Sequence, residues 1–170
     1  MNMDAIEAIM SRRSIRRYTD KRIPEDKITT LLKAAMNSPS AHNRQPWHFI
    51  VIDDKEILRK VPEYHQYSSM LKYASHAIIV LGDNKIQKTD FWIHDCSAAL
   101  ENILIAANAM ELGAVWLGVH PHEDLIEKTR YLFNIPDHVT PLAIVSLGYP
   151  DETKPPRENY NPERVHRNKW

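Results

Sequence analysis

The segment 91–112 is the longest helical candidate in the sequence, and it restricts the possible folds more than any other feature. Its apolar side chains recur at helical spacing, and further alanine, leucine and isoleucine residues make most of its remaining surface apolar. Asp90 is expected to cap its start and Gly113 to follow its end. A helix that is apolar nearly all round is a buried helix. In a chain of 170 residues, this helix predicts that a partner chain covers one of its sides.

The rest of the pattern predicts an α+β sandwich, in which helices cover a sheet. One short helix is expected after Asp4, a second opens at Pro24, and a later one opens at Pro121. Largely apolar runs predict strands at residues 47–52, 77–81, 114–119 and 142–147. Because the first strand follows two helices, the elements do not alternate as they do in a parallel α/β fold.

Residues 151–170 form a tail that differs from the rest of the chain. The tail contains three prolines and many charges, and it has no apolar run large enough to make a core. Such a segment is not expected to pack by itself. We predict an arm that lies on another surface, with Val165 and Trp170 as its anchors.

Charge and composition argue against several classes of protein. The 22 basic and 22 acidic side chains give a net charge of zero, which does not indicate a nucleic-acid partner. No apolar run approaches the roughly 18 residues of a membrane span, and residues 1–4 lack the basic start of a signal peptide. Cys96 is the only cysteine, so an intrachain disulfide is impossible. A reducing, cytoplasmic location is the expectation.

The sequence has few glycines, and this affects how it can bind phosphate. Its four glycines do not form a GxGxxG motif, and the pair Gly113 and Gly118 is followed by Val119 and His120 rather than by the Lys and Ser/Thr of a P-loop. Any phosphate would therefore need side-chain donors. The nucleophile motif GxSxG is also missing.

Two polar segments are candidates for ligand binding. Residues 12–17 read R-R-S-I-R-R. The guanidinium group of an arginine can donate two parallel hydrogen bonds to two oxygens of a phosphate. On composition alone, a solvated basic patch explains this run equally well. Residues 38–47 read S-P-S-A-H-N-R-Q-P-W, a small polar loop bracketed by prolines. This loop can present hydrogen-bonding groups to a flat heterocycle, although taken alone it also suits an ordinary connection between a helix and a strand.

Together these two segments resemble the signatures of the nitroreductase family. R-R-S-x-R is similar to the motif that binds FMN phosphate in that family, and S-P-S-x-x-N-x-Q-P-W is similar to its second signature. Weaker similarities are A-S-H-A at 74–77, the helix that runs into G-A-V-W-L-G at 113–118, and G-Y-P at 148–150 followed by K-P-P-R. The resemblance covers roughly residues 4–157.

The resemblance implies a particular architecture. This is a nitroreductase-like sandwich with a central, mostly antiparallel mixed sheet flanked by helices. Residues 1–150 would form the FMN-binding domain, and residues 151–170 would be a C-terminal extension of the same domain, exchanged between the subunits of a homodimer. Each flavin site would then lie at the dimer interface.

The resemblance also assigns roles to individual residues, and the phosphate contacts come first. Arg12 and Ser14 would bind the phosphate with Arg13 beside them, while Arg157 would close on it and Lys154 is a weaker candidate.

The remaining assigned residues would surround the ring of the flavin. Arg16 would lie near flavin N1 and O2, and the backbone of Leu117 and Gly118 would approach N5 and O4. The second copy would cover the ring with Pro39, Ser40, Ala41 and Asn43, with Gln45 as an additional contact.

The activity that the resemblance implies is ping-pong hydride transfer from NAD(P)H, through flavin N5, to a small nitroaromatic, quinone or activated alkene. The flavin carries this chemistry, so no catalytic side chain is assigned. One alternative is a protein that binds or stores flavin, or senses redox state, without turnover. Another is a specialised enzyme of the same superfamily, such as a reductive dehalogenase or a flavin-cleaving enzyme.

Other residues that suggest chemistry are explained more simply by structure. His120 and His122 lack a third clustered ligand, so we predict no metal site. His94, Asp95 and Cys96 are adjacent on a helix and point in different directions, so they cannot form a triad. Cys96 lies on the apolar stripe and is expected to be a buried thiol.

Two segments depart from the family pattern. Residues 86–90 are too short for the extra helical excursion that shapes the substrate pocket of larger members. Residues 67–70 lack the lysine or asparagine that binds the flavin pyrimidine in some members. The identity of the substrate does not follow from the resemblance.

Overall fold

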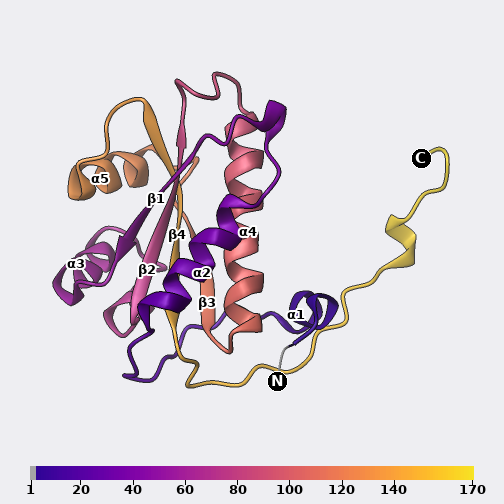
Figure 1. The fold of residues 1–170 in the computed structure, drawn as a ribbon, viewed down its shortest axis with the longest axis horizontal. Helices are drawn as coiled ribbons and strands as arrows, with labels where there is room; N and C mark the ends of the chain where they lie inside the picture. Colours follow the sequence, from indigo (N-terminus) through magenta and orange to yellow (C-terminus); the bar gives the residue numbers. More distant parts are fainter. Residues whose placement is uncertain (1–2) are drawn as a thin grey trace.

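A four-stranded antiparallel sheet forms the centre of the computed structural model, which describes residues 3–170 (Figure 1). Its order is β1-β2-β4-β3, and the strands are β1 (Trp47–Ile52), β2 (His76–Asp83), β3 (Gly113–Gly118) and β4 (Val139–Gly148). The predicted α+β sandwich is therefore confirmed. Within the described residues, the one parallel contact is the bridge between Ser14 and Ala114. Residues 1 and 2, part of the segment judged unlike a signal peptide, lie outside the described range.

Helices cover both faces of the sheet. On one face lie α2 (Glu25–Met36) and α4 (Phe91–Ala109), and on the other lie α3 (Lys55–Lys60) and α5 (Glu123–Phe133) (Figure 1). Because strand side chains alternate, Ile78 and Val80 of β2 join the core under α2 and α4. Ile79 and Leu81 join the core on the opposite face. Strands β2 and β4 are buried along their whole length, so β1 and β3 are the two edges.

The predicted elements differ from the structure mainly at their ends. We expected the long helix to reach residue 112 with Gly113 behind it, but α4 ends at Ala109, and Glu111 has the left-handed backbone with φ of 61°. Gly113 instead begins β3, where an added Cβ would lie 2.6 Å from Ile15 Cγ2. The glycine is therefore needed for a close approach and not for a helix end. Asp90 precedes α4, but its side chain makes no capping bond.

The helix starts agree better with the sequence. Asp4 accepts a hydrogen bond of 2.9 Å from the Glu7 N–H at the start of α1 (Ala5–Ser11). Asp54 caps α3, a helix that the apolar pattern did not predict. Pro24 was expected in the first helical turn and lies one residue earlier, at the N-cap of α2.

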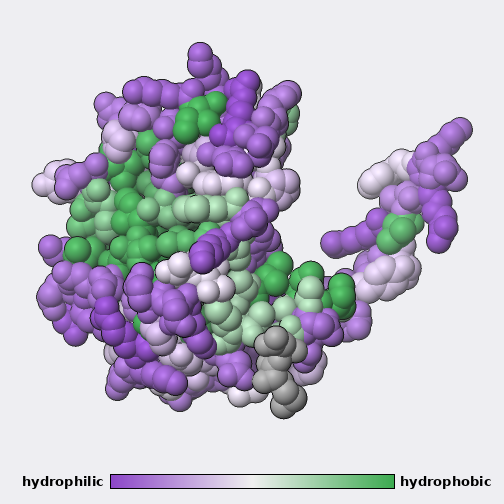
Figure 2. Space-filling view, in the orientation of Figure 1, coloured by the Kyte–Doolittle hydropathy of each residue, from purple (hydrophilic) through white to green (hydrophobic). Residues whose placement is uncertain are grey.

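One side of the molecule carries exposed apolar groups. In α1, Ile6, Ile9 and Met10 are 69%, 50% and 61% exposed, and Figure 2 shows hydrophobic surface over this helix. The tail runs along the body of the protein as far as Pro155, which accepts a hydrogen bond from Arg13, and then leaves it; Val165 and Trp170 are exposed (Figure 1). The covering of these groups by a second copy stays a prediction.

Candidate functional site

A cavity of about 930 Å³ lies at the end of β3. Its walls are the edge of β3, residues 64–70 and the first turn of α5. Arg16 adds a cation to this lining, so one of the predicted arginines faces the cavity. Leu117 and Gly118, which were also predicted site residues, line the same space. The sequence therefore identified three residues that the fold brings together.

The open edge of β3 presents backbone groups to this cavity. Val119 N–H donates to Leu142 O at 3.0 Å, which directs this residue toward β4. Ile15 N–H donates to Ala114 O at 3.0 Å on the opposite, open side. Because backbone groups alternate along a strand, Trp116 and Gly118 direct theirs to the same open side as Ala114. The N–H of Gly118 is thus available to an acceptor in the cavity.

Gly118 also leaves room in the cavity. A Cβ placed on this residue would meet no heavy atom within 4 Å, and its φ is not positive. Neither packing nor backbone conformation therefore requires glycine at this position. The open space suits a flat group that lies against the backbone.

The arginine motif follows the same edge toward the beginning of β3. Ser14 pairs with Ala114, and the four steps along the strand from Ala114 to Gly118 span about 13 Å. Arg12 Nε lies 3.1 Å from Glu101 Oε1, and Arg13 Nε donates to Pro155 O at 3.1 Å. An elongated anion could lie along this edge, with its charge at the arginine end.

Glu152 organises the backbone of the arginine motif, and sequence reasoning missed it. Its Oε1 accepts the N–H of Arg16 at 2.6 Å and that of Arg17 at 3.3 Å. Lys154, a predicted site residue, lies 3.3 Å from its other oxygen. The Arg16 bond is the main reason why the pKa of Glu152 is below its usual value, and Lys154 adds to the effect. Arg157, farther along the tail, is exposed.

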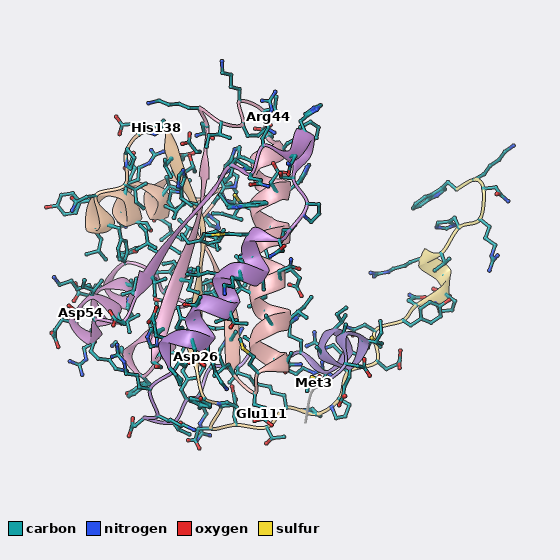
Figure 3. The ribbon with its side chains drawn as sticks, in the orientation of Figure 1. Met3, Asp26, Arg44, Asp54, Glu111 and His138 are labelled. Carbon is teal, nitrogen blue, oxygen red and sulfur yellow. The ribbon has the colours of Figure 1, made fainter. Side chains whose placement is uncertain are left out.

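The second predicted motif lies at the far end of α4. Ala41 N–H donates to Asp95 Oδ1 at 2.8 Å near the start of the helix, whereas Asn108 Nδ2 donates to Ala8 O at 2.9 Å near its end. Asp95 and Asn108 lie 13 positions apart, which is about 20 Å of helix. Figure 3 shows this separation, with Arg44 at one end of α4 and Met3 at the other. The side chain of Arg12 extends back to Glu101, six positions or about 9 Å from Asp95. Within residues 3–170, no hydrogen bond or ion pair joins the two motifs.

The loop that carries this second motif has a strained backbone. His42, Asn43 and Gln45 have φ values of 54°, 54° and 50°, in the left-handed region that non-glycine residues seldom adopt. Gln45 N–H donates to Ser40 Oγ at 2.9 Å, and Gln45 Nε2 donates to Asn43 Oδ1 at 3.0 Å. Pro39 is exposed beside them. Strain of this kind gathers at functional sites, which supports a role in binding.

Residues 64–70 contribute most of the side chains that sequence reasoning did not find. Gln66, Tyr67 and Ser69 line the cavity, while His65 and Ser68 are buried behind them. No periodic signal marks this segment, because it consists mainly of irregular turns between two short 3₁₀ helices. His122, which we considered only as a metal ligand, also lines the cavity from the start of α5.

The other residues that suggested chemistry in the sequence have structural surroundings. His120 packs edge-on against Trp92, with ring centroids 5.1 Å apart. Cys96 is fully buried, as expected, and burial raises the pKa of its thiol to about 12. Within residues 3–170, no group of three or more His, Cys, Asp or Glu side chains is placed to hold a metal. No helix in the same range is long and apolar enough to cross a membrane.

Comparisons with known proteins agree with this geometry. The model of the nitroreductase family matches residues 9–77 and 63–149. A Methanothermobacter thermautotrophicus protein, named provisionally as an NADH dehydrogenase/NAD(P)H nitroreductase, is 50% identical over 99% of this chain and 88% of its own length.

Two solved structures are similar over almost their whole length. One, a Parabacteroides distasonis protein with the same provisional name, shares 40% identity and a TM-score of 0.95, with 98% of each chain covered. The other, an FMN-dependent nitroreductase from Clostridium difficile, shares 32% identity and a TM-score of 0.91, with 97% of this chain and 99% of that one covered. The chain therefore belongs to the nitroreductase family.

Proposed function

We propose that this protein is an NAD(P)H-dependent oxidoreductase that binds FMN along the open edge of β3. The observation that carries this proposal is the continuity of that edge, which begins beside the arginine motif at Ser14 and ends in the cavity at Gly118. The FMN-dependent relative from Clostridium difficile and the NAD(P)H-related name of the archaeal relative support the same cofactor and the same reductant.

The residues present fit FMN. Ser14, Arg12 and Arg13 would hold the phosphate in a chain without a glycine-rich phosphate loop, with Lys154 and Arg157 as further donors from the tail. The ring would lie on Gly118, where the space for a Cβ is empty. Leu117 is buried and supports the strand from behind.

When bound, FMN accepts hydride at N5 from the nicotinamide and passes the electrons to a small acceptor. The protein supplies position and charge. Arg16 places a guanidinium in the cavity, where it would stabilise negative charge on the pyrimidine side of the ring. The Gly118 N–H would donate to an acceptor atom at the ring edge. We propose a nitroaromatic, a quinone or an activated alkene as the acceptor, in a reducing compartment such as the cytoplasm.

We also propose that two copies share each site. Within the described part of one chain, no hydrogen bond or ion pair joins the two motifs, and the loop of the second motif lies at the opposite end of α4 from α1. If two α4 helices pack antiparallel about a twofold axis, the loop of one copy reaches the cavity of the other. Pro39, Ser40, Ala41, Asn43 and Gln45 would then cover the ring. The same packing would bury the exposed apolar side chains of α1 and give the tail, residues 151–170, a surface to bind.

A flavin-binding protein without turnover is the second candidate. A tail or side chain that filled the space above the ring would favour it. The residues that line the cavity all come from positions 16–125, and the tail does not enter. The open space therefore favours the enzyme over the storage or sensing protein, and it also suits a specialised enzyme such as a reductive dehalogenase.

Titration with FMN and with riboflavin tests the cofactor assignment. FMN should bind more tightly, because riboflavin lacks the phosphate that the arginines would hold. The variant Arg12→Ala should lose FMN affinity by about tenfold or more, since a charge-assisted hydrogen bond contributes about 1.5–3 kcal/mol. Equal affinities of the wild-type chain for both ligands would refute the phosphate assignment.

A mixing experiment tests whether the sites are shared. Arg12→Ala and Asn43→Ala chains should each bind FMN poorly as homodimers. After refolding together, each heterodimer would have one site with both substitutions and one intact site. Partial recovery of FMN binding is expected. Verified heterodimers without recovery would mean that each site is built within one chain.

A further inference from the structure

His65 is a buried histidine in the cavity wall to which the proposed chemistry gives no role. Its side chain is only 2% exposed, and Nε2 lies 2.9 Å from the carbonyl oxygen of Gly118. A carbonyl oxygen can only accept, so Nε2 must carry the hydrogen. This bond joins two walls of the cavity, residues 64–70 and the edge of β3, across 53 positions in the sequence.

The other ring nitrogen of His65 indicates that the imidazole is not simply a packing residue. Nδ1 is buried and has no hydrogen-bonding partner within residues 3–170. Buried polar atoms without partners are uncommon in folded proteins. The fold thus keeps a side chain that satisfies one nitrogen atom and leaves the other unpaired, next to this cavity.

The surroundings of His65 hold it in place. The Ser68 N–H and hydroxyl both donate to the His65 carbonyl, at 3.1 Å and 2.7 Å. The neighbouring Tyr64 hydroxyl lies 3.1 Å from Thr129 Oγ1 on α5. The ring is therefore fixed from its own turn and, through Tyr64, from the third wall of the cavity.

We propose that His65 is a positioning residue that aligns the end of β3 for the flavin. The C=O and the N–H of Gly118 both face the open side of the strand, and the His65 bond holds the C=O. This bond sets the direction of the N–H that the flavin would meet. The inference rests on the proposed FMN site, and it assigns to His65 no contact with the ring itself.

Selective labelling with ¹⁵N-glycine gives a direct readout, because the chain has only four glycines. Each amide resonance can be assigned by single Gly→Ala substitutions in the full-length protein. The test variants are His65→Gln, whose amide nitrogen reaches the place of Nε2, and His65→Asn, whose amide reaches only the place of Nδ1. His76→Gln is the control, since His76 is equally buried but bonds to Ser75 Oγ away from the cavity.

In apo His65→Asn, we expect the Gly118 resonance to shift or broaden while those of Gly82 and Gly148 stay in place. The dissociation constant of the His65→Asn variant for FMN should rise by about tenfold, the size of effect expected when one buried acceptor loses its donor. His65→Gln should restore the Gly118 resonance and bring FMN affinity to within about threefold of wild type. His76→Gln should change neither of these readouts.

Two results would overturn the proposal. One is an unchanged Gly118 resonance and an unchanged FMN affinity in His65→Asn. The other is equal damage by the Asn and Gln variants, which would mean that the imidazole acts by shape alone. Failure of the FMN assignment looks different, because the wild-type chain would then not bind FMN, although its apo Gly118 resonance would still respond to His65→Asn.

Discussion

Replacing Gly118 with alanine separates what the fold needs from what the ligand needs. The added methyl group would meet no protein atom within 4 Å, and the backbone of Gly118 does not have a positive φ. Such a substitution is expected to leave stability unchanged or raise it by about 0.4–1 kcal/mol, because alanine restricts the unfolded chain. The methyl group would, however, occupy the space in which the flavin ring is proposed to lie.

Gly148→Ala is the matched control at the other end of the same strand pair. There an added Cβ would lie 2.6 Å from two ring atoms of Tyr18 and 2.8 Å from its Cβ. Tyr18 is buried and donates a hydrogen bond to Ile15 O, so it cannot move freely. Overpacking of this kind costs about 1–3 kcal/mol of folding free energy.

Urea unfolding and FMN titration of both variants give the decisive comparison. Gly118→Ala should keep its unfolding midpoint and lose FMN affinity by about tenfold, equivalent to about 1.4 kcal/mol. Gly148→Ala should show the reverse, with lower stability and near-normal FMN affinity in the folded protein. The reasoning is wrong if Gly118→Ala binds FMN as wild type does, since the ring would then not lie on this residue.

Three further predictions concern other parts of the chain. Because burial, with Asp95 beside it, raises the pKa of the Cys96 thiol to about 12, a thiol reagent should not label the folded protein, whereas the denatured chain should take up one equivalent. The pKa of Glu152 is lowered in the folded protein, so this carboxylate stabilises the fold at pH values above its unfolded pKa of about 4.3. That stability is lost as the pH falls through the lower folded pKa. The urea midpoint of Glu152→Gln should therefore depend less on acid pH than that of the wild-type protein. Deletion of residues 159–170, which are all exposed, should weaken the dimer without unfolding the protomer, and light scattering over a range of concentrations would detect this.

Local pattern was sufficient to predict the strands, because buried strands appear as apolar runs. The run 47–52 has the same limits as β1, and 114–119 differs from β3 by one residue at each end. The end of α4 could not be predicted in this way. Glu111 adopts the left-handed backbone, and Gly113 is needed for its contact with Ile15, which comes from a distant part of the chain.

In the candidate site, too, some residues could be predicted from local motifs, and others depend on contacts between distant parts of the chain. Arg16 and Gly118 belong to recognisable motifs, and both line the cavity. Glu152 and His65 act through hydrogen bonds to backbone groups 136 and 53 positions away, respectively, and no spacing in the sequence signals such pairs. Residues 64–70 could not be found from periodicity either, because irregular turns have none.

Anaerobic addition of NADH or NADPH to the purified, FMN-loaded protein tests the proposed function most directly. We predict that the yellow absorbance of the flavin disappears with at least one of the two nucleotides. It should return when a nitroaromatic, a quinone or an activated alkene is then added without oxygen. A protein that holds FMN at one per chain, but keeps its absorbance with both nucleotides, would contradict the proposed oxidoreductase and leave a flavin-binding protein without turnover.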